Sequence, residues 1–156
     1  MRRFICASFA LSLLLAFATL PARADDKSDI DATVQKSIAA FNTGNAKAIA
    51  ALGAPGIQTV IDDFGVHYWA SPNALANWFG DFGRMTKAAG AVNSPITVSP
   101  AKYVEIDKNH AWATYPIAFS YSIKGTAHSE AGVLAYALEK VAGTWRIQGI
   151  AWGRTS

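Results

Sequence analysis

Cysteine is almost absent from this chain of 156 residues, whose single cysteine is Cys6. Cys6 lies in an apolar N-terminal segment that we expect to be removed, so the remaining chain would hold neither a disulfide nor a reactive thiol. The sequence also contains no G-x-S-x-G, no phosphate-binding P-loop and no G-x-G-x-x-G motif. The spacings H-x-H, H-E-x-x-H and C-x-x-C are missing too, and we therefore predict neither a metal site nor a cofactor.

The N-terminal segment has the three parts of a secretory signal peptide. Arg2 and Arg3 precede an almost unbroken apolar run from Phe4 to Leu20, and residues 22–24, Ala-Arg-Ala, have the small-x-small spacing that a signal peptidase cleaves. We predict that residues 1–24 are removed and that the protein is exported, to the periplasm or the medium. The alternative is a transmembrane anchor, but the apolar run is shorter than the roughly 20 residues that a spanning helix needs. We expect no membrane span after cleavage.

Excess positive charge is missing from the part of the chain that would remain. The whole sequence has 14 Lys and Arg against 11 Asp and Glu, but Arg2, Arg3 and Arg23 belong to the predicted signal peptide. Residues 25–156 then carry 11 basic and 11 acidic side chains and are formally neutral. Binding to nucleic acid or to an anionic membrane depends on clustered Lys and Arg. We expect neither as a partner.

Two helices are predicted at the start of the remaining chain. Ser28 can cap the first helix, whose apolar residues recur at helical spacing: Ile30, Val34, Ile38 and Phe41. Asn42-Thr43-Gly44 ends this helix. Asn45 can cap a second, shorter helix, which residues 53–56 end.

A strand, a third helix and a group of strands follow. β-Branched residues predict the strand, from Ile57 to about Phe64, and Ser71-Pro72 has the serine cap and first-turn proline of a helix, in which we interpret Trp78 as a core residue. After Gly90 the pattern changes to four strand-like runs separated by turn-forming residues: Ile96–Ile106, Ala111–Ile123, Ala127–Leu138 and Thr144–Trp152. Helices followed by antiparallel strands predict a single α+β domain over residues 25–156.

This order of elements resembles the NTF2-like (SnoaL-like) cone. Residues 41–45, Phe-Asn-Thr-Gly-Asn, are similar to the junction between the first two helices of that fold, and residues 143–147, Gly-Thr-Trp-Arg-Ile, to the start of its last strand. Residues 61–69, with two aspartates, a histidine and a tryptophan, resemble an exported bacterial subgroup. The resemblance covers Asp29 to Arg154 and implies three N-terminal helices packed on a curved antiparallel sheet. It implies no single activity, since the fold hosts isomerases, dehydratases, cyclases and non-catalytic binders.

The resemblance also implies a conical apolar cavity between the sheet and the helices. Successive side chains of a strand point to opposite faces, and the family's pocket register then directs two sets inward: Tyr115, Ile117, Phe119 and Tyr121 on one strand, and Gln148, Ile150 and Trp152 on the last. A small apolar or aromatic ligand is expected to contact six side chains there: Tyr115, Phe119, Tyr121, Ile150, Trp152 and, where the strand leaves the cavity mouth, Trp69. The alternative is a filled core in which these rings pack against one another.

Asp62 and Asp63 are candidate catalytic residues. They are neighbours on the predicted strand, so at most one should enter the cavity. A carboxylate there loses hydration, its pKa rises, and it becomes a usable general base near neutral pH. The resemblance aligns Asp62 with the proton-shuttling aspartate of ketosteroid isomerase. Alternatively, both are strand-end carboxylates bonded to nearby amides or solvated. His67 is a candidate acid/base partner, or else a surface or capping residue.

The comparison with ketosteroid isomerase also argues against steroid isomerisation. At the positions of its two oxyanion-stabilising donors, this sequence has Ser37 and, within a residue or so, Leu134. A different enolisation or dehydration, using Asp62 with His67 or Tyr115, remains open as a cofactor-free isomerase or lyase. The leading hypothesis is a non-catalytic domain that binds a small molecule and forms a homodimer through its sheet. A subunit that pairs with another protein through the exposed sheet face is a third hypothesis.

Overall fold

The computed structural model describes residues 22–155. Most of the predicted signal peptide, residues 1–21, lies outside this range. The first helix, α1 (Ala22–Asn42), begins before the predicted cleavage site. Among the described residues, no helix combines the length and the apolar composition needed to cross a membrane.

The first two helices follow the sequence prediction except at the start of α1, which begins at Ala22, so that Ser28, the predicted cap, lies inside the helix. The apolar stripe of α1 is buried, with Ile30 and Val34 0% exposed and Ile38 7% exposed. The helix ends at Asn42, and Asn45 caps α2 (Ala46–Ala51) because its side-chain oxygen accepts the N–H of Ala48 at 3.0 Å. Local spacing and capping therefore determine this part of the fold.

The predicted strand over residues 57–64 is shorter than expected. β1 (Gln58–Ile61) stops before Asp62, and the chain turns back to form β2 (Tyr68–Ser71), which pairs antiparallel with β1. The N–H of Asp62 donates to the carbonyl of His67, and the N–H of His67 donates to that of Phe64. These bonds close a hairpin loop that the sequence reading missed.

α3 (Ala74–Ala89) begins later than predicted. Its N-cap is Asn73, since Ser71 still belongs to β2, and the Ser71 hydroxyl oxygen accepts the N–H of Asn73 at 3.2 Å. The helix ends at Gly90, whose φ of 65° lies in the left-handed region that glycine adopts readily.

The remaining strands form most of the sheet. They are β3 (Ala91–Asn93), β4 (Thr97–Val98), β5 (Tyr103–Asp107), β6 (His110–Ile123), β7 (Thr126–Val141) and β8 (Thr144–Arg154). The single strand predicted over residues 96–106 is interrupted, and β3, β4 and β5 pair with successive parts of β6. Pro95 and Pro100 lie between these short strands, and proline has no N–H to donate to a sheet.

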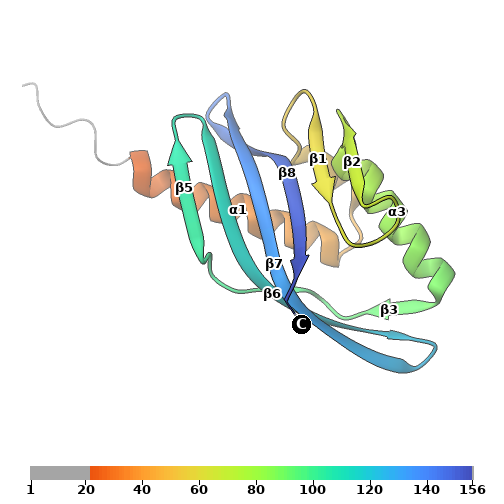
Figure 1. Cartoon of the computed structure of the whole chain (residues 1–156). Helices are drawn as coiled ribbons and strands as arrows, with labels where there is room; N and C mark the ends of the chain where they lie inside the picture. The colour runs from red at the N-terminus through yellow and green to blue at the C-terminus, as the bar shows by residue number, and fades with distance from the viewer. Residues whose placement is uncertain (1–21, 156) are drawn as a thin grey trace, which may run out of the picture.

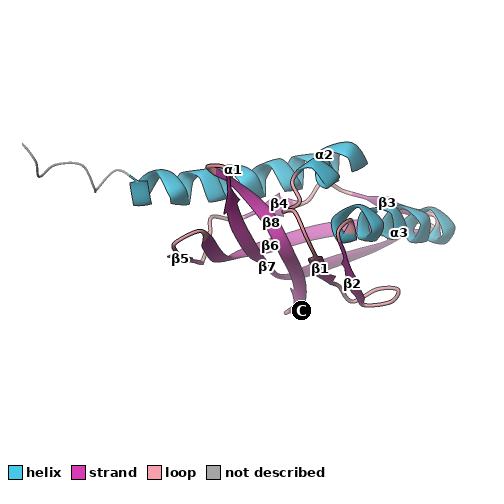
Figure 2. Ribbon diagram, turned by 90° about the horizontal axis from the view of Figure 1, so that it is seen from above, coloured by secondary structure: helices cyan, strands magenta, loops and turns pink. Residues whose placement is uncertain are grey.

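The sheet is mixed and strongly curved. Its order is β2-β1-β8-β7-β6-β3, with β4 and β5 also on β6, and every pairing is antiparallel except that of β1 with β8. The long β6–β7 hairpin curls away at one end (Figure 1). All three helices lie on one side of the sheet (Figure 2). The predicted α+β cone is confirmed, with one parallel pair in a sheet that the sequence predicted to be antiparallel.

The core fills the space between α1 and the narrow end of the cone. Its largest fully buried side chains are Trp145, Tyr115 and Tyr136, each 1–2% exposed. The Tyr115 and Tyr136 rings meet edge to face, with centroids 5.9 Å apart. Beyond Tyr136 the packing opens, and the wide end of the cone is hollow.

Candidate functional site

A cavity of about 340 Å³ lies between the helices and the curved end of the sheet. This volume is within the usual range for small-molecule sites. Eight aromatic side chains line it: Phe41 of α1, Phe64 of the loop between β1 and β2, Trp78 and Phe82 of α3, Phe119 and Tyr121 of β6, Tyr136 of β7, and Trp152 of β8. The cavity is therefore an apolar container with an aromatic wall.

Four of the six predicted ligand-contacting side chains line this cavity. They are Phe119, Tyr121, Ile150 and Trp152. Their alternation along β6 and β8 directs them toward the helices, as the period of a strand requires. Whether they contact a ligand stays a prediction, which the cavity makes testable.

Tyr115 and Trp69 do not line the cavity. Tyr115 lies deeper along β6, 1% exposed, and its hydroxyl donates to Asp31 of α1. Trp69 of β2 is 7% exposed, and its indole N–H donates to Asp81 of α3 at 2.8 Å. Both side chains support the walls of the cone.

A β-bulge explains why Gln148 does not reach the cavity. The register between β7 and β8 skips this residue, so the alternation of β8 changes phase there. Ile147 before the bulge and Ile150 after it are both buried on the helix side, although their sequence separation is odd. Strand alternation without the bulge placed Gln148, Ile150 and Trp152 on one face.

Asp62 and Asp63 both line the cavity, although strand alternation allowed only one of them to do so. The reason is that β1 ends at Ile61 and both aspartates lie in the following loop. Asp62 Oδ2 accepts the indole N–H of Trp78 at 2.8 Å, and its Oδ1 accepts the N–H of Asp63 at 2.7 Å. Burial outweighs these two bonds and raises the pKa of Asp62 to about 6.

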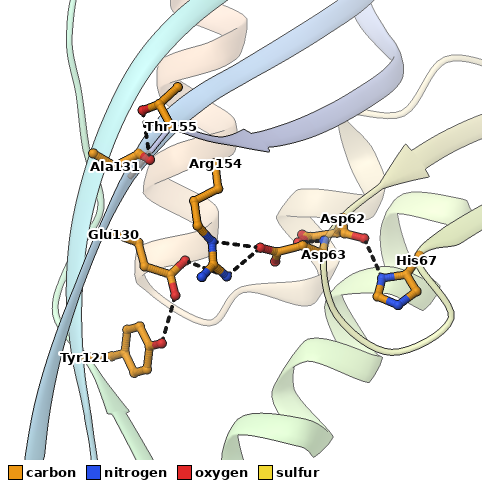
Figure 3. Close-up of polar contacts among 8 residues, drawn as sticks. All are labelled: Asp62, Asp63, His67, Tyr121, Glu130, Ala131, Arg154 and Thr155. Atoms are coloured by element: carbon orange, nitrogen blue, oxygen red, sulfur yellow. Dashed lines mark hydrogen bonds and ion pairs between the residues drawn. The ribbon is translucent and has the colours of Figure 1, made fainter.

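Asp63, whose side chain is 43% exposed, belongs to a chain of polar contacts among residues that line the cavity (Figure 3). Its Oδ2 accepts from Arg154 Nη2 at 2.6 Å and Nε at 3.1 Å, and Arg154 Nη2 lies 3.4 Å from Glu130 Oε2. The Tyr121 hydroxyl donates to Glu130 Oε1 at 2.8 Å. Donating this proton to a carboxylate raises the pKa of Tyr121. These contacts join β6, β7 and β8 to the loop after β1.

His67 lies outside the cavity. Its ring Nδ1 is 3.2 Å from the backbone carbonyl of Asp62, and the residue is exposed with a φ of 63°. Figure 3 shows its ring on the opposite side of the loop from Arg154. The structure therefore does not bring His67 to the Asp62 carboxylate.

The cavity also holds a pair of hydroxyl groups that the sequence analysis did not combine. Ser37 and Leu134, aligned with the oxyanion positions, both line it, and so does Tyr136. The Ser37 hydroxyl donates to the carbonyl of Val34 at 2.7 Å and lies 3.0 Å from the Tyr136 hydroxyl. Burial raises the pKa of Tyr136 to about 12.

Three further residues of the site were missed for identifiable reasons. Trp78 was interpreted as a core residue, although its N–H holds Asp62. Glu130 pairs with Phe119 across the β6–β7 hairpin, so the register of that hairpin is the signal that places it at the cavity. Arg154 follows Trp152 at a spacing of two along β8. Within residues 22–155, no group of three or more His, Cys, Asp or Glu side chains is arranged to hold a metal ion.

Known proteins resemble this chain in structure but not detectably in sequence. No protein-family profile matches the chain, and no curated protein is significantly similar in sequence. A ketosteroid isomerase-like protein from Erwinia carotovora atroseptica has a TM-score of 0.69 at 15% identity, covering 85% of this chain and 98% of its own.

Two other solved structures agree with this one. An NTF2-like superfamily protein from Salmonella enterica serovar Typhimurium has a TM-score of 0.69 at 15% identity, covering 86% of this chain and 94% of its own. A hexachlorocyclohexane dehydrochlorinase (LinA) type 2 has a TM-score of 0.70 at 9% identity, covering 86% and 88%. At these identities the likeness concerns the fold alone.

Proposed function

We propose, from the premise that this chain has the NTF2-like fold, that it is a non-catalytic binding domain for a small, mainly apolar or aromatic molecule. The observation that carries the proposal is the open cavity of about 340 Å³ with its aromatic wall. Apolar walls favour a ligand in rough proportion to the apolar surface removed from water. A few polar groups, Asp62 foremost, would then fix the ligand's orientation.

A catalytic role for Asp62 has less support from the residues that line the cavity. His67 and Tyr115, the two predicted assistants of Asp62, do not line it. The hydroxyl of Ser37 is engaged with a backbone carbonyl of its own helix. Binding therefore accounts for the site with fewer additional requirements than catalysis.

Native mass spectrometry of the protein, isolated gently from cells that produce it, tests the proposal. We expect one small molecule retained per chain. Ile38→Trp places an indole in the cavity wall and should abolish retention, while Gln35→Trp, at an exposed position of the same helix, should leave it intact. A protein that is always empty and binds no apolar probe would contradict the proposal.

A second function is favoured by one specific observation, the raised pKa of Asp62 at the cavity wall. With a pKa of about 6, this carboxylate suits a general base in a cofactor-free isomerase or lyase. Asp62→Asn should then lower the turnover of activated ketones by two orders of magnitude or more. Near neutral pH the melting temperature of the variant should be no lower than that of the wild type, and unchanged turnover in the variant would exclude Asp62 as the base.

Export is a further part of the proposed role. Support comes from the sequence of residues 1–24, with its two arginines, apolar run and cleavage spacing. We expect the protein isolated from producing cells to come from the periplasm and to begin at Asp25. The N-terminal peptide mass of the isolated protein decides this.

A homodimer through the sheet completes the proposal. On the face of β6 and β7 that strand alternation directs away from the cavity, three cross-strand pairs in the middle of the hairpin are small and uncharged: Thr114 with Ala135, Pro116 with Val133, and Ala118 with Ala131. A surface without charges in its centre is typical of protein interfaces. A second copy of this chain would cover it.

A further inference from the structure

We propose that the ligand of this cavity is an organic cation, an amine carried on an apolar or aromatic body. This inference deepens the proposed binding function and rests on it. It is drawn from the charges of the cavity wall, from the hydrogen bonds that the wall has already formed, and from its aromatic faces.

The charged residues that line the cavity are mostly acidic. They are Asp62, Asp63, Glu130 and Arg154, three carboxylates against one guanidinium. Arg154 lies between Asp63 and Glu130, at 2.6 and 3.4 Å, so its single charge is already shared by two carboxylates (Figure 3). Among residues 22–155, the carboxylate of Asp62 contacts no cationic side chain, and its hydrogen bonds come from Trp78 and from the N–H of Asp63. A bound cation would restore the balance of charge, and a bound anion would worsen it.

Four polar side chains that line the cavity, Trp78, Tyr121, Ser37 and Tyr136, favour a ligand that donates. The indole N–H of Trp78 is used by Asp62, and the hydroxyl of Tyr121 by Glu130. Since the Ser37 hydroxyl donates to a backbone carbonyl, the Tyr136 hydroxyl donates to Ser37. The oxygens of these groups can still accept hydrogen bonds, but their donor hydrogens are already used. An ionised carboxylate has about four acceptor sites, of which Asp62 uses two.

The carboxylate of Asp62 lies beside aromatic rings, which also attract cations. Trp78 holds it by the indole N–H, and the Trp78 ring stacks on Phe41 with centroids 5.8 Å apart. Phe82 is the next ring, with its centroid 6.4 Å from that of Trp78. An ammonium group bound to Asp62 would lie at the N–H edge of Trp78, next to a cluster of rings whose faces attract cations. The ligand's apolar body would extend along Phe119 and Trp152, whose centroids are 5.8 Å apart.

A set of three ligands with the same naphthalene body tests the inference. They are 2-(1-naphthyl)ethylamine, 2-(1-naphthyl)ethanol and 1-naphthylacetate, which are cationic, neutral and anionic near neutral pH. We expect calorimetric titration of the protein expressed from the full sequence to show the amine binding at least tenfold more tightly than the alcohol. The acetate should bind most weakly.

Two variants with the same change in net charge locate the effect. Asp62→Asn should lower the amine-to-alcohol ratio of affinities at least fivefold, with the affinity for the alcohol changed less than threefold. Glu105→Gln, at an exposed site on β5 outside the cavity, should leave the ratio unchanged. If Asp62→Asn fails to fold, Glu130→Gln replaces it, with a smaller decrease expected because Arg154 already shares that charge.

The outcomes separate this inference from the function on which it rests. An alcohol that binds as tightly as the amine, or an acetate that binds more tightly, would overturn the cation preference and leave the apolar binding site standing. Equal losses in Asp62→Asn and Glu105→Gln would overturn the assignment to Asp62. If none of the three ligands binds and the isolated protein is empty, the proposed function fails together with the inference.

Discussion

Asp62 shows at the scale of a single residue how this fold places a charge in an apolar wall. Its carboxylate gains two hydrogen bonds but loses hydration, and the loss is the larger effect, so its pKa rises from 3.8 to about 6. Between these two values the folded protein binds more protons than the unfolded chain. The stabilising contribution of Asp62 is therefore fully present below about pH 4 and is lost as the pH rises through about 6.

Asp62→Asn should remove this pH dependence of stability. From about pH 4 to about pH 7, the free energy of unfolding of the wild type is expected to fall by roughly 1–2 kcal/mol relative to that of the variant. This is less than the full pKa shift implies, because the carboxyl is partly exposed. The neighbouring Asp63, Glu130 and Arg154 are present in both proteins, so the difference isolates Asp62. Urea unfolding of both proteins over this range measures it. A difference that stays constant with pH would show that Asp62 titrates normally.

At the scale of elements, the ladder between β7 and β8 decides which side chains reach the cavity. The bulge at Gln148 changes the phase of β8, so that Ile150 and Trp152 enter the wall. Opposite them, Gly132 of β7 leaves room for the Trp152 ring. A Cβ on Gly132 would lie 2.3 Å from the Gly153 carbonyl oxygen and 2.5 Å from Trp152 Cη2.

Gly132→Ala should therefore destabilise the protein by about 1–3 kcal/mol and shift the Trp152 ring. The obstructing atoms are a strand backbone and a packed indole, neither of which can move without disturbing the sheet. Gly153→Ala is the matched control, since a Cβ there would meet nothing within 4 Å, and its cost should stay within about 0.5 kcal/mol. Denaturant unfolding and tryptophan fluorescence measure both effects. Equal costs would show that the Gly132 contact relaxes freely.

At the scale of the whole molecule, the helices cover one face of the sheet and leave the other face uncovered (Figure 2). Val133 lies at the centre of the uncovered β6–β7 surface, opposite Pro116. In the proposed homodimer, this position would be buried between two copies. The cavity opens on the other side of the sheet, so dimerisation would leave it accessible.

Val133→Lys should weaken the dimer at least a hundredfold, because it would bury two like charges at its centre. Val92→Lys makes the same change on β3, at a side chain that is 69% exposed, and should not affect assembly. Sedimentation velocity over a range of concentrations measures both. A wild-type protein that is monomeric at high concentration would contradict the dimer.

The sequence by itself determined the α+β class, the α1 stripe, the Asn45 cap and the three long strands, because spacing and capping act between residues close together in the chain. Together with the resemblance to a family's pocket register, it placed four of the six expected ligand-contacting side chains in the cavity wall. Tertiary structure decided the rest. The loop that brings both aspartates inward, the bulge at Gln148 and the pairing of Asp63 with Arg154, 91 residues apart, all depend on which strands become neighbours. Such pairings leave no periodic pattern in a sequence. The pattern also does not distinguish inward-facing rings that fill a core from rings that enclose a cavity.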